Sequence, residues 1–307
     1  MEDISTLPYS HQPLRSISLP TRTHPCSKRV EALLNHLKPH HPKSSNTICF
    51  EADTIQSDLV VLAELYNCME ELFHSPLTQK TLVHYQNGKL VEEALCGSVT
   101  LLDACGTARD LLLSIKEHVQ TLQSAIRRRK RGDSSIESSI ASYENFRKKA
   151  KKEITKQLSA MKRMEQKNHC FSHVGQQDQC IIFLARVLRE ASTITIYTFC
   201  SCLMFLSMPG LRTKGSSLIS KLKHRRLFSS DKNTNEVLDL NGVLCALIGR
   251  GKNSDSKEEV QGALRVLETL NVGIDGLERG LNSIFRCLVK NRFKILHIGT
   301  TLNEPRR

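Results

Sequence analysis

A repeating apolar pattern between Val91 and Ile126 constrains the fold of this chain more than any other feature. Stepping alternately three and four residues along it gives Val91, Ala94, Ser98, Leu101, Cys105, Ala108, Leu112, Ile115, Val119, Leu122 and Ile126. Ser98 is the single polar member of this series. A period of 3.5 residues predicts one long helix that packs against a partner helix along its whole length.

Two further features refine this prediction. Glycine costs roughly 1 kcal/mol in a helix interior, so Gly97 is a candidate helix start with Ser98 as its N-cap. The apolar face is also wider than a coiled-coil seam, which favours a helical bundle over a two-stranded coil. The residues that widen it are Leu95, Leu102, Leu111 and Leu113.

Helical spacing recurs on both sides of the central stretch. Residues 55–73 predict a helix that ends at Ser75-Pro76, because proline disfavours helix in the residue before it. A short helix is expected at 77–85. A more polar helix is expected from Ser135 to about Lys167, at an edge of the bundle.

The last long helix is expected at 260–298, with a short apolar helix before it at 236–248. The apolar faces 101–126 and 267–288 are far apart in sequence but have the same period. We expect them to pack in one core, closing the bundle.

Residues 1–47 contain six of the nine prolines and little periodicity, so they predict a disordered arm. Leu33, Leu34 and Leu37 predict one short helical turn within it. The fold class is therefore all-α: an elongated helical bundle at 48–300 with coiled-coil-like long helices, a disordered N-terminal arm and a tail at 301–307. Mobile loops are expected near 168–179, 209–235 and 249–257.

Residues 181–208 predict another helix, and 191–208 carry no charge for eighteen positions. That length touches the threshold for a membrane span. Six serines and threonines dilute the run, and Arg186, Arg189 and Glu190 adjoin it. We favour a buried core helix, with a membrane span as the alternative.

The cysteines bear on the compartment. The chain has eleven of them, an odd number, without a CxxC pair, which favours reduced thiols that act as small hydrophobic side chains. Residues 1–30 lack the apolar segment of a secretory signal, although a transit peptide stays open. We expect a cytoplasmic protein, peripherally attached to a membrane or alternatively nuclear, and not secreted.

Motifs for catalysis or cofactor binding are weak. His169, Cys170, His173 and Cys180 lack the tight paired spacing of zinc sites. Gly249-Arg250-Gly251-Lys252 lacks the upstream glycine and the following Ser or Thr of a phosphate-binding loop. The carboxylates near the central helix have no His or Cys partner at a spacing that suggests acid–base chemistry. We therefore expect no catalytic, cofactor or metal site and no small-molecule substrate.

The positive charge is concentrated. Residues 127–163 hold thirteen Lys or Arg against four acids, within a chain of net charge +13. This excess predicts a polyanionic partner, the simpler alternative being a solvated helix face. The candidate binding residues are Arg127, Arg128, Arg129, Lys130, Arg131, Arg147, Lys148, Lys149, Lys151 and Lys152.

Two uses of these clusters are open. Their separation resembles a bipartite nuclear import signal, and each basic residue beside an anionic membrane contributes about 1 kcal/mol. We favour the membrane, because both clusters fall on or beside packed helices. Aromatic side chains for stacking on nucleic acid are sparse near these clusters, with only Tyr143 and Phe146 just before the second one.

Several short motifs are spread over residues 14–298. They are Arg15–Pro20 with Thr21–Pro25, Leu65–Leu72, Ser75–Gln79, Leu101–Asp103, Gly106–Asp110, Arg127–Gly132, Phe146–Lys149, Leu277–Leu281 and Phe285-Arg286. Together these motifs resemble the plant-specific BYPASS-related family. The resemblance implies a helical plant protein without established catalytic residues, linked to root and shoot development. The ending Ile295-Leu296-His297 departs slightly from the family pattern, which leaves the last helical turn in question.

The N-terminal motif predicts a phosphorylation switch. Arg15, Ser18 and Pro20 fit the pattern Arg-Ser-x-Ser-x-Pro, which 14-3-3 proteins capture through an arginine cluster when the second serine is phosphorylated. Chance is the simpler explanation, since such residues are common in disordered arms.

Taken together, these patterns lead us to expect a noncatalytic plant regulator or adaptor. It would act through helix-mediated protein contacts and a basic surface. The alternatives are a nuclear or nucleic-acid-associated factor that uses the basic clusters, and a membrane-associated protein.

Overall fold

A computed structural model describes residues 25–38, 51–84, 88–128, 135–169, 179–207 and 257–303, together with residues 237, 239–240 and 243–244. In these ranges the regular structure is helical, without strands. The helices are α1 (Pro25–Leu37), α2 (Ala52–His74), α3 (Pro76–His84), α4 (Gly88–Arg127), α5 (Ser135–His169), α6 (Gln179–Ser207) and α9 (Lys257–Asn303). Residues 1–24 of the predicted arm, and most of the predicted loops, lie outside the described residues.

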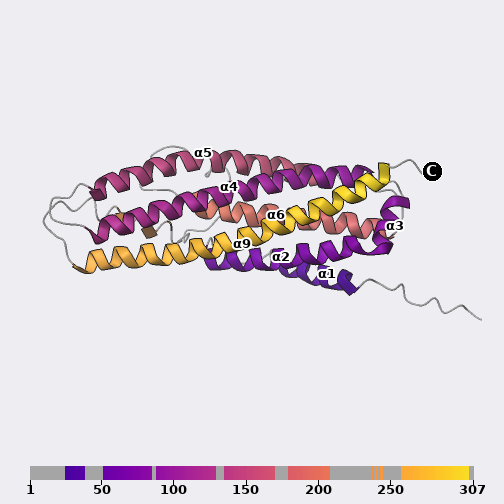
Figure 1. Ribbon diagram of the computed structural model, residues 1–307, viewed down its shortest axis with the longest axis horizontal. Helices are drawn as coiled ribbons and strands as arrows, with labels where there is room; N and C mark the ends of the chain where they lie inside the picture. Colours follow the sequence, from indigo (N-terminus) through magenta and orange to yellow (C-terminus); the bar gives the residue numbers. More distant parts are fainter. Residues whose placement is uncertain are drawn as a thin grey trace, which may run out of the picture.

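The long helices lie side by side along one axis and give the molecule an elongated shape (Figure 1). Helix α4 has 40 residues and α9 has 47, which correspond to about 60 and 70 Å. The predicted all-α, elongated bundle is confirmed. Helix α9 continues to Asn303, so the prediction that residues 301–303 form a tail was wrong.

The core forms where α4 packs against α9. Leu112 and Ile115 of α4, and Leu277 and Leu281 of α9, are all fully buried. The helices are antiparallel, since Cys105 Sγ contacts the Leu281 carbonyl at one level and Lys116 reaches Asp275 at another. The prediction that these two distant apolar faces share one core is confirmed.

Helix α4 does not begin at Gly97, as its low helix propensity had predicted. The helix runs unbroken from Gly88. The Ser98 hydroxyl donates backwards to the Leu95 carbonyl, 2.7 Å away, instead of capping a helix start. Arg292 of α9 donates to the same carbonyl and to Ser98 Oγ at 2.5 and 2.6 Å. Tertiary contacts thus hold the helix through a residue that weakens it locally.

A buried polar network ties α2, α6 and α9 together. The Thr195 hydroxyl donates to the Ala191 carbonyl at 2.7 Å, so the Tyr66 hydroxyl, 3.0 Å away, must be the donor to Thr195. Asn291 donates to the Tyr66 carbonyl at 2.9 Å. Burial raises the pKa of Tyr66 to about 12, so its hydroxyl keeps its proton at neutral pH. Buried hydrogen bonds of this kind favour one register of the helices.

Helix α6 is a core helix. More than half of its 29 residues are buried, among them Phe199, Leu203 and Phe205. The buried hydroxyls of Thr195 and Thr198 donate to carbonyls of the preceding turn. The interpretation of this apolar run as a buried helix is confirmed, and none of the described helices has the length and apolarity needed to cross a membrane.

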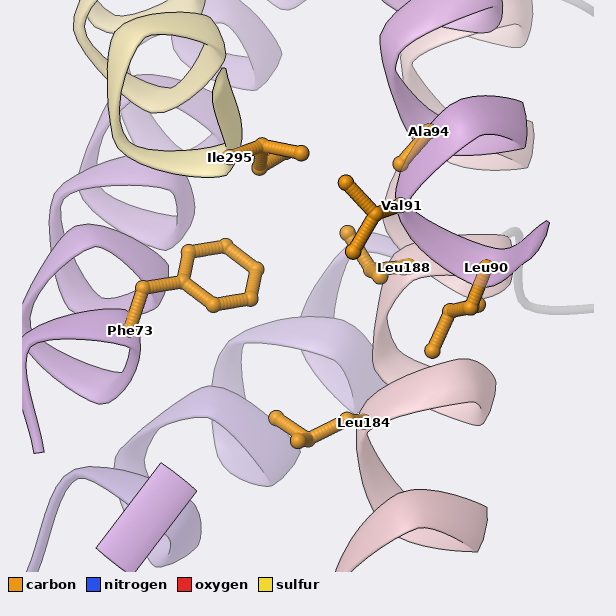
Figure 2. A pocket seen from close by; sticks show the side chains of 7 residues that line it. All are labelled: Phe73, Leu90, Val91, Ala94, Leu184, Leu188 and Ile295. Carbon is orange, nitrogen blue, oxygen red and sulfur yellow. The ribbon is translucent and has the colours of Figure 1, made fainter. Parts of the chain in front are cut away.

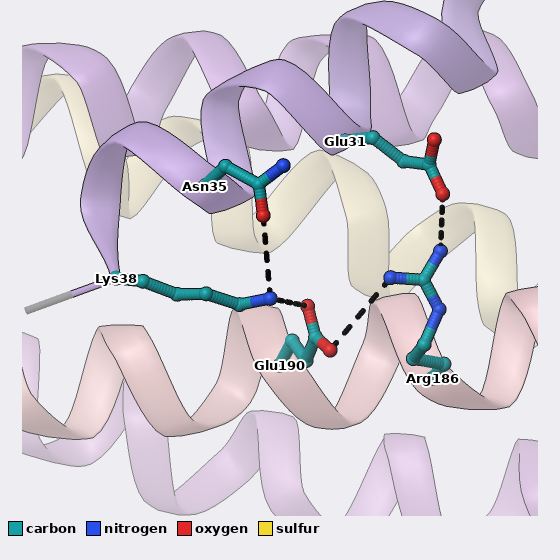
Figure 3. A network of polar contacts seen from close by, with 5 residues as sticks. All are labelled: Glu31, Asn35, Lys38, Arg186 and Glu190. Carbon is teal, nitrogen blue, oxygen red and sulfur yellow. Dashed lines mark hydrogen bonds and ion pairs between the residues drawn. The ribbon is translucent and has the colours of Figure 1, made fainter.

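Helix α1 was underestimated from sequence. The three leucines predicted a single turn within a disordered arm, but residues 25–37 form a helix of 13 residues. Val30 and Leu34 are fully buried against α2 and α6. At its edge, Glu31 pairs with Arg186 at 2.5 Å, and Lys38 pairs with Glu190 at 3.2 Å (Figure 3). The bundle therefore begins at Pro25 rather than at residue 48.

Candidate anion-binding face of helix α5

Helix α5 lies at an edge of the bundle, where it packs against α4 and α6. Its inner side buries Ile140, Tyr143, Ile154 and Met161. This narrow apolar stripe over 35 residues leaves the rest of the helix surface in solvent. The predicted edge position of this polar helix is confirmed.

The solvent side of α5 carries a continuous group of basic residues, here named the α5 basic face. Eight residues between 148 and 163 are exposed; seven of them are basic, and the eighth is Ser159. Because successive residues of a helix are rotated by about 100°, these seven fall within an arc of about 160° opposite the buried stripe. They are Lys148, Lys149, Lys151, Lys152, Lys156, Lys162 and Arg163.

The α5 basic face extends about 23 Å along the helix. Lys156 lies 3.6 Å from Glu153, an acid at the flank of the face. The other six cations form no ion pair with any residue that the structure describes. A surface of this kind attracts anions, and its attraction is screened by salt.

Arg147 does not belong to this surface, although the sequence places it in the second basic cluster. Its guanidinium turns inward and donates to the Leu206 carbonyl in the last turn of α6. The final carbonyls of a helix lack partners within the helix, so Arg147 stabilises the end of α6. Burial lowers the pKa of Arg147. Including it among the polyanion-binding residues was wrong, because one step along a helix turns a side chain by about 100°.

The first predicted cluster is described in part. Arg127 and Arg128 are exposed at the end of α4, while Arg129, Lys130 and Arg131 lie outside the described residues. Helices α4 and α5 are antiparallel, since Gly97 lies beside Met164 and His118 lies beside Phe146. Arg127 is the last residue of α4, so it lies at the end of the bundle where α5 begins (Figure 1). Lys148 is thirteen residues further along α5, or about 20 Å from that end.

Sequence reasoning missed Lys156, Lys162 and Arg163. Their signal was present, since Lys148, Lys152 and Lys156 follow one another at intervals of four residues. On a helix, residues four positions apart lie on the same side, so this spacing indicates a basic face that runs of adjacent charges do not reveal. Arg15, Ser18 and Pro20 lie outside the described residues, so the phosphorylation switch stays a prediction.

A small apolar cavity lies between α2, α4, α6 and α9 (Figure 2). Its volume is about 10 Å³, near the minimum for one water molecule. Carbon side chains surround it, including Phe73, Val91 and Ile295, which face one another across the space in Figure 2. It offers no polar group to orient a ligand.

The described side chains include no group of three that could hold a metal ion. Of the candidate zinc residues, Cys170 and His173 lie outside the described part. Burial raises the pKa of both Cys105 and Cys202 to about 12. These thiols are protonated at neutral pH and act as packing groups, as expected for small hydrophobic side chains.

Comparison with known proteins places the chain in a family. No curated protein and no solved structure matches it. A family model described as "Protein BPS1" matches residues 58–298, from the second turn of α2 to the last turns of α9. The match covers more than three quarters of the chain, including all of α3, α4, α5 and α6 and most of α2 and α9. The protein therefore belongs to the BPS1, or BYPASS-related, family of plant regulators of development.

Proposed function

We propose that this protein is a noncatalytic regulatory adaptor that attaches to an anionic membrane through the α5 basic face. The remaining surfaces of the bundle stay available to protein partners. The observation that carries the proposal is the composition of that face, where seven of eight exposed residues are basic. Helix α5 packs against α4 and α6 along its other side, so the cations are presented together to solvent.

The electrostatic binding free energy of the α5 basic face is sufficient for reversible attachment to a membrane. Each basic residue near an anionic membrane contributes about 1 kcal/mol, so four or five in reach supply about 4–5 kcal/mol. No large apolar side chain is exposed on the described part of α5. Attachment would therefore be electrostatic, without insertion into the lipid, and sensitive to salt.

The exposed surface of α5 favours a membrane over nucleic acid. Single-stranded nucleic acid is bound by stacking bases on aromatic rings as well as by charge. Tyr143 is buried, and Phe146 is half-buried against the His118 ring, with the ring centroids 4.8 Å apart. Neither ring is available on the α5 basic face for stacking.

Vesicle flotation tests the proposal. The full chain is mixed with phosphatidylcholine vesicles with and without phosphatidylserine. Replacing three cations (Lys148→Gln, Lys152→Gln and Lys156→Gln) should weaken binding to the anionic vesicles about a hundredfold, from about 1 kcal/mol for each residue. The matched control removes three exposed lysines elsewhere, Lys28→Gln, Lys80→Gln and Lys290→Gln.

The control variant should bind nearly as the parent protein does, and raised salt should release the parent. Equal loss in both triple variants would show a dependence on net charge alone and would overturn the proposal. A test variant that keeps vesicle binding but loses binding to single-stranded RNA would replace the membrane by nucleic acid as the partner. Melting curves of all variants confirm that they fold.

A further inference from the structure

An open groove of about 510 Å³ lies between α4 and the first half of α5, here named the α4–α5 groove. His118 contributes its ring from α4, and the remaining lining comes from α5. Four polar residues of α5 follow one another at intervals of four, three and four, so they share one side of the helix over about 16 Å. They are Ser138, Ser142, Asn145 and Lys149.

The lining has the chemistry of a site for a phosphoryl group. Two hydroxyls, an amide, an ammonium group and an imidazole can all donate hydrogen bonds, and no carboxylate lines the groove. Lys149 supplies a full positive charge at one end. Ser138 lies in the first turns of α5, where the helix dipole favours an anion.

His118 is held in place on the α4 side. Its ring packs against Phe146 with the centroids 4.8 Å apart, and it meets the edge of Tyr143 at 6.2 Å. Burial lowers the pKa of His118, so its ring is neutral at neutral pH and donates one N–H. The ring thus forms a fixed polar wall opposite the serines.

The groove is continuous with the α5 basic face. Lys149 belongs to both, and Lys152 and Lys156 continue along the same side of α5 beyond the groove. A phosphate held in the groove would therefore lie at the end of a row of cations. A membrane that contacts the row would present its headgroups to the groove at the same time.

We propose that the α4–α5 groove binds the phosphoryl group of a phosphorylated polyol, either the headgroup of a membrane lipid or a free organic phosphate. Lys149 pairs with the phosphate charge, and Ser138 and Ser142 donate hydrogen bonds to its oxygens. Asn145 hydrogen-bonds a hydroxyl of the ligand. The lipid source rests on the membrane attachment proposed above, whereas the free phosphate does not.

Two matched substitutions of exposed serines test the groove without changing charge. Ser142→Leu fills it, whereas Ser159→Leu places the same side chain on the α5 basic face outside it. Soluble inositol trisphosphate is titrated into the full chain, with myo-inositol as the unphosphorylated control. Binding is followed by calorimetry and by the NMR signal of the His118 ring, assigned by its loss in His118→Gln.

Inositol trisphosphate should bind the parent and the Ser159→Leu variant alike and shift the His118 signal. Ser142→Leu should weaken binding about tenfold or more, the effect of losing hydrogen bonds to a charged group, and should abolish the shift. Vesicles that contain a phosphatidylinositol phosphate, or phosphatidylserine at equal charge, identify the source. If the ligand is a lipid headgroup, Ser142→Leu should weaken binding to the vesicles that contain the phosphatidylinositol phosphate. Binding to the phosphatidylserine vesicles should not change.

The experiments can contradict the groove proposal and the membrane-attachment proposal independently of each other. Equal binding of inositol trisphosphate by the Ser142→Leu and Ser159→Leu variants, or no binding by the parent, overturns the groove and leaves attachment to phosphatidylserine vesicles standing. Binding of inositol trisphosphate in the groove, with no flotation on any anionic vesicle, overturns membrane attachment and assigns the groove to a free organic phosphate.

Discussion

Helix α9 passes close to α2 at Gly280. A methyl group added there would lie 2.9 Å from Leu59 Cδ1 and 3.0 Å from Leu59 Cβ. Leu59 is fully buried, so making room for that methyl group would require its side chain to shift within a packed core. Because Gly280 has no side chain, α9 and α2 can approach each other closely at this point. This close contact accounts for a glycine in the helix interior, where its helix propensity is low.

Gly280→Ala should therefore lower the melting temperature, because overpacking costs about 1–3 kcal/mol and exceeds the gain of about 1 kcal/mol in helix propensity. Gly262 lies in the same helix, with no atom within 4 Å of an added methyl group. Gly262→Ala should raise the free energy of unfolding by about 0.5–1 kcal/mol and therefore raise the melting temperature. Thermal denaturation of both variants checks the pair, and changes of the same sign would contradict the close approach.

Asn291 shows a second residue-level effect. It lies on the same side of α9 as the buried Leu288 and Ile295, three residues before it and four after it, and it is 3% exposed. Its amide donates to the Tyr66 and Cys287 carbonyls at 2.9 and 3.0 Å. Within a long apolar interface, such a residue stabilises one register of α2 against α9 relative to registers shifted along the helices. It does so at some cost in overall stability.

Helix α1 depends on its neighbours for its structure. Isolated helices shorter than about 12–15 residues are marginal in water, and α1 has 13. Its ion pairs with α2 and α6 involve side chains that are 25–59% exposed, and pairs of this kind contribute about 0–1 kcal/mol each. Burial of Val30 and Leu34 must therefore supply most of the docking energy.

Leu34→Ala should cost roughly 2–5 kcal/mol, as truncation of a buried leucine does, and should accelerate amide hydrogen exchange throughout α1. Arg186→Ala removes the ion pair with Glu31 in Figure 3 and should cost about 1 kcal/mol or less. Mass-spectrometric hydrogen exchange on the full chain compares the two. A larger effect from Arg186→Ala would mean that charge, rather than apolar burial, holds α1.

For the molecule as a whole, the joint core of α4 and α9 should decide stability. Leu112→Ala and Leu281→Ala each remove a fully buried side chain and should each cost roughly 2–5 kcal/mol. Leu113→Ala is the control, since Leu113 neighbours Leu112 but is 44% exposed, and surface changes usually stay within about 0.5 kcal/mol. Full stability of either core variant in denaturant melts would rule out the shared core.

Local patterns in the sequence predict the helices of this protein and much of their packing. Helical period is a local property that repeats over many residues, so 36 residues of regular spacing predicted α4, and the same spacing in α9 identified its partner. The Ser75-Pro76 break between α2 and α3 was also local, because it follows from the shape of proline. The excess of basic residues along α5 is likewise visible in the sequence, because it depends only on composition.

The positions of individual side chains, in contrast, depend on which helices lie next to one another. Arg147 and Lys148 are adjacent in sequence, yet one supports the end of α6 and the other faces solvent, because α6 lies on one side of α5 only. Gly97 stays within α4 because Arg292, far along the chain, contacts that turn. The α4–α5 groove likewise needs His118 beside Ser142, a pairing that follows from how two helices cross and not from any local pattern.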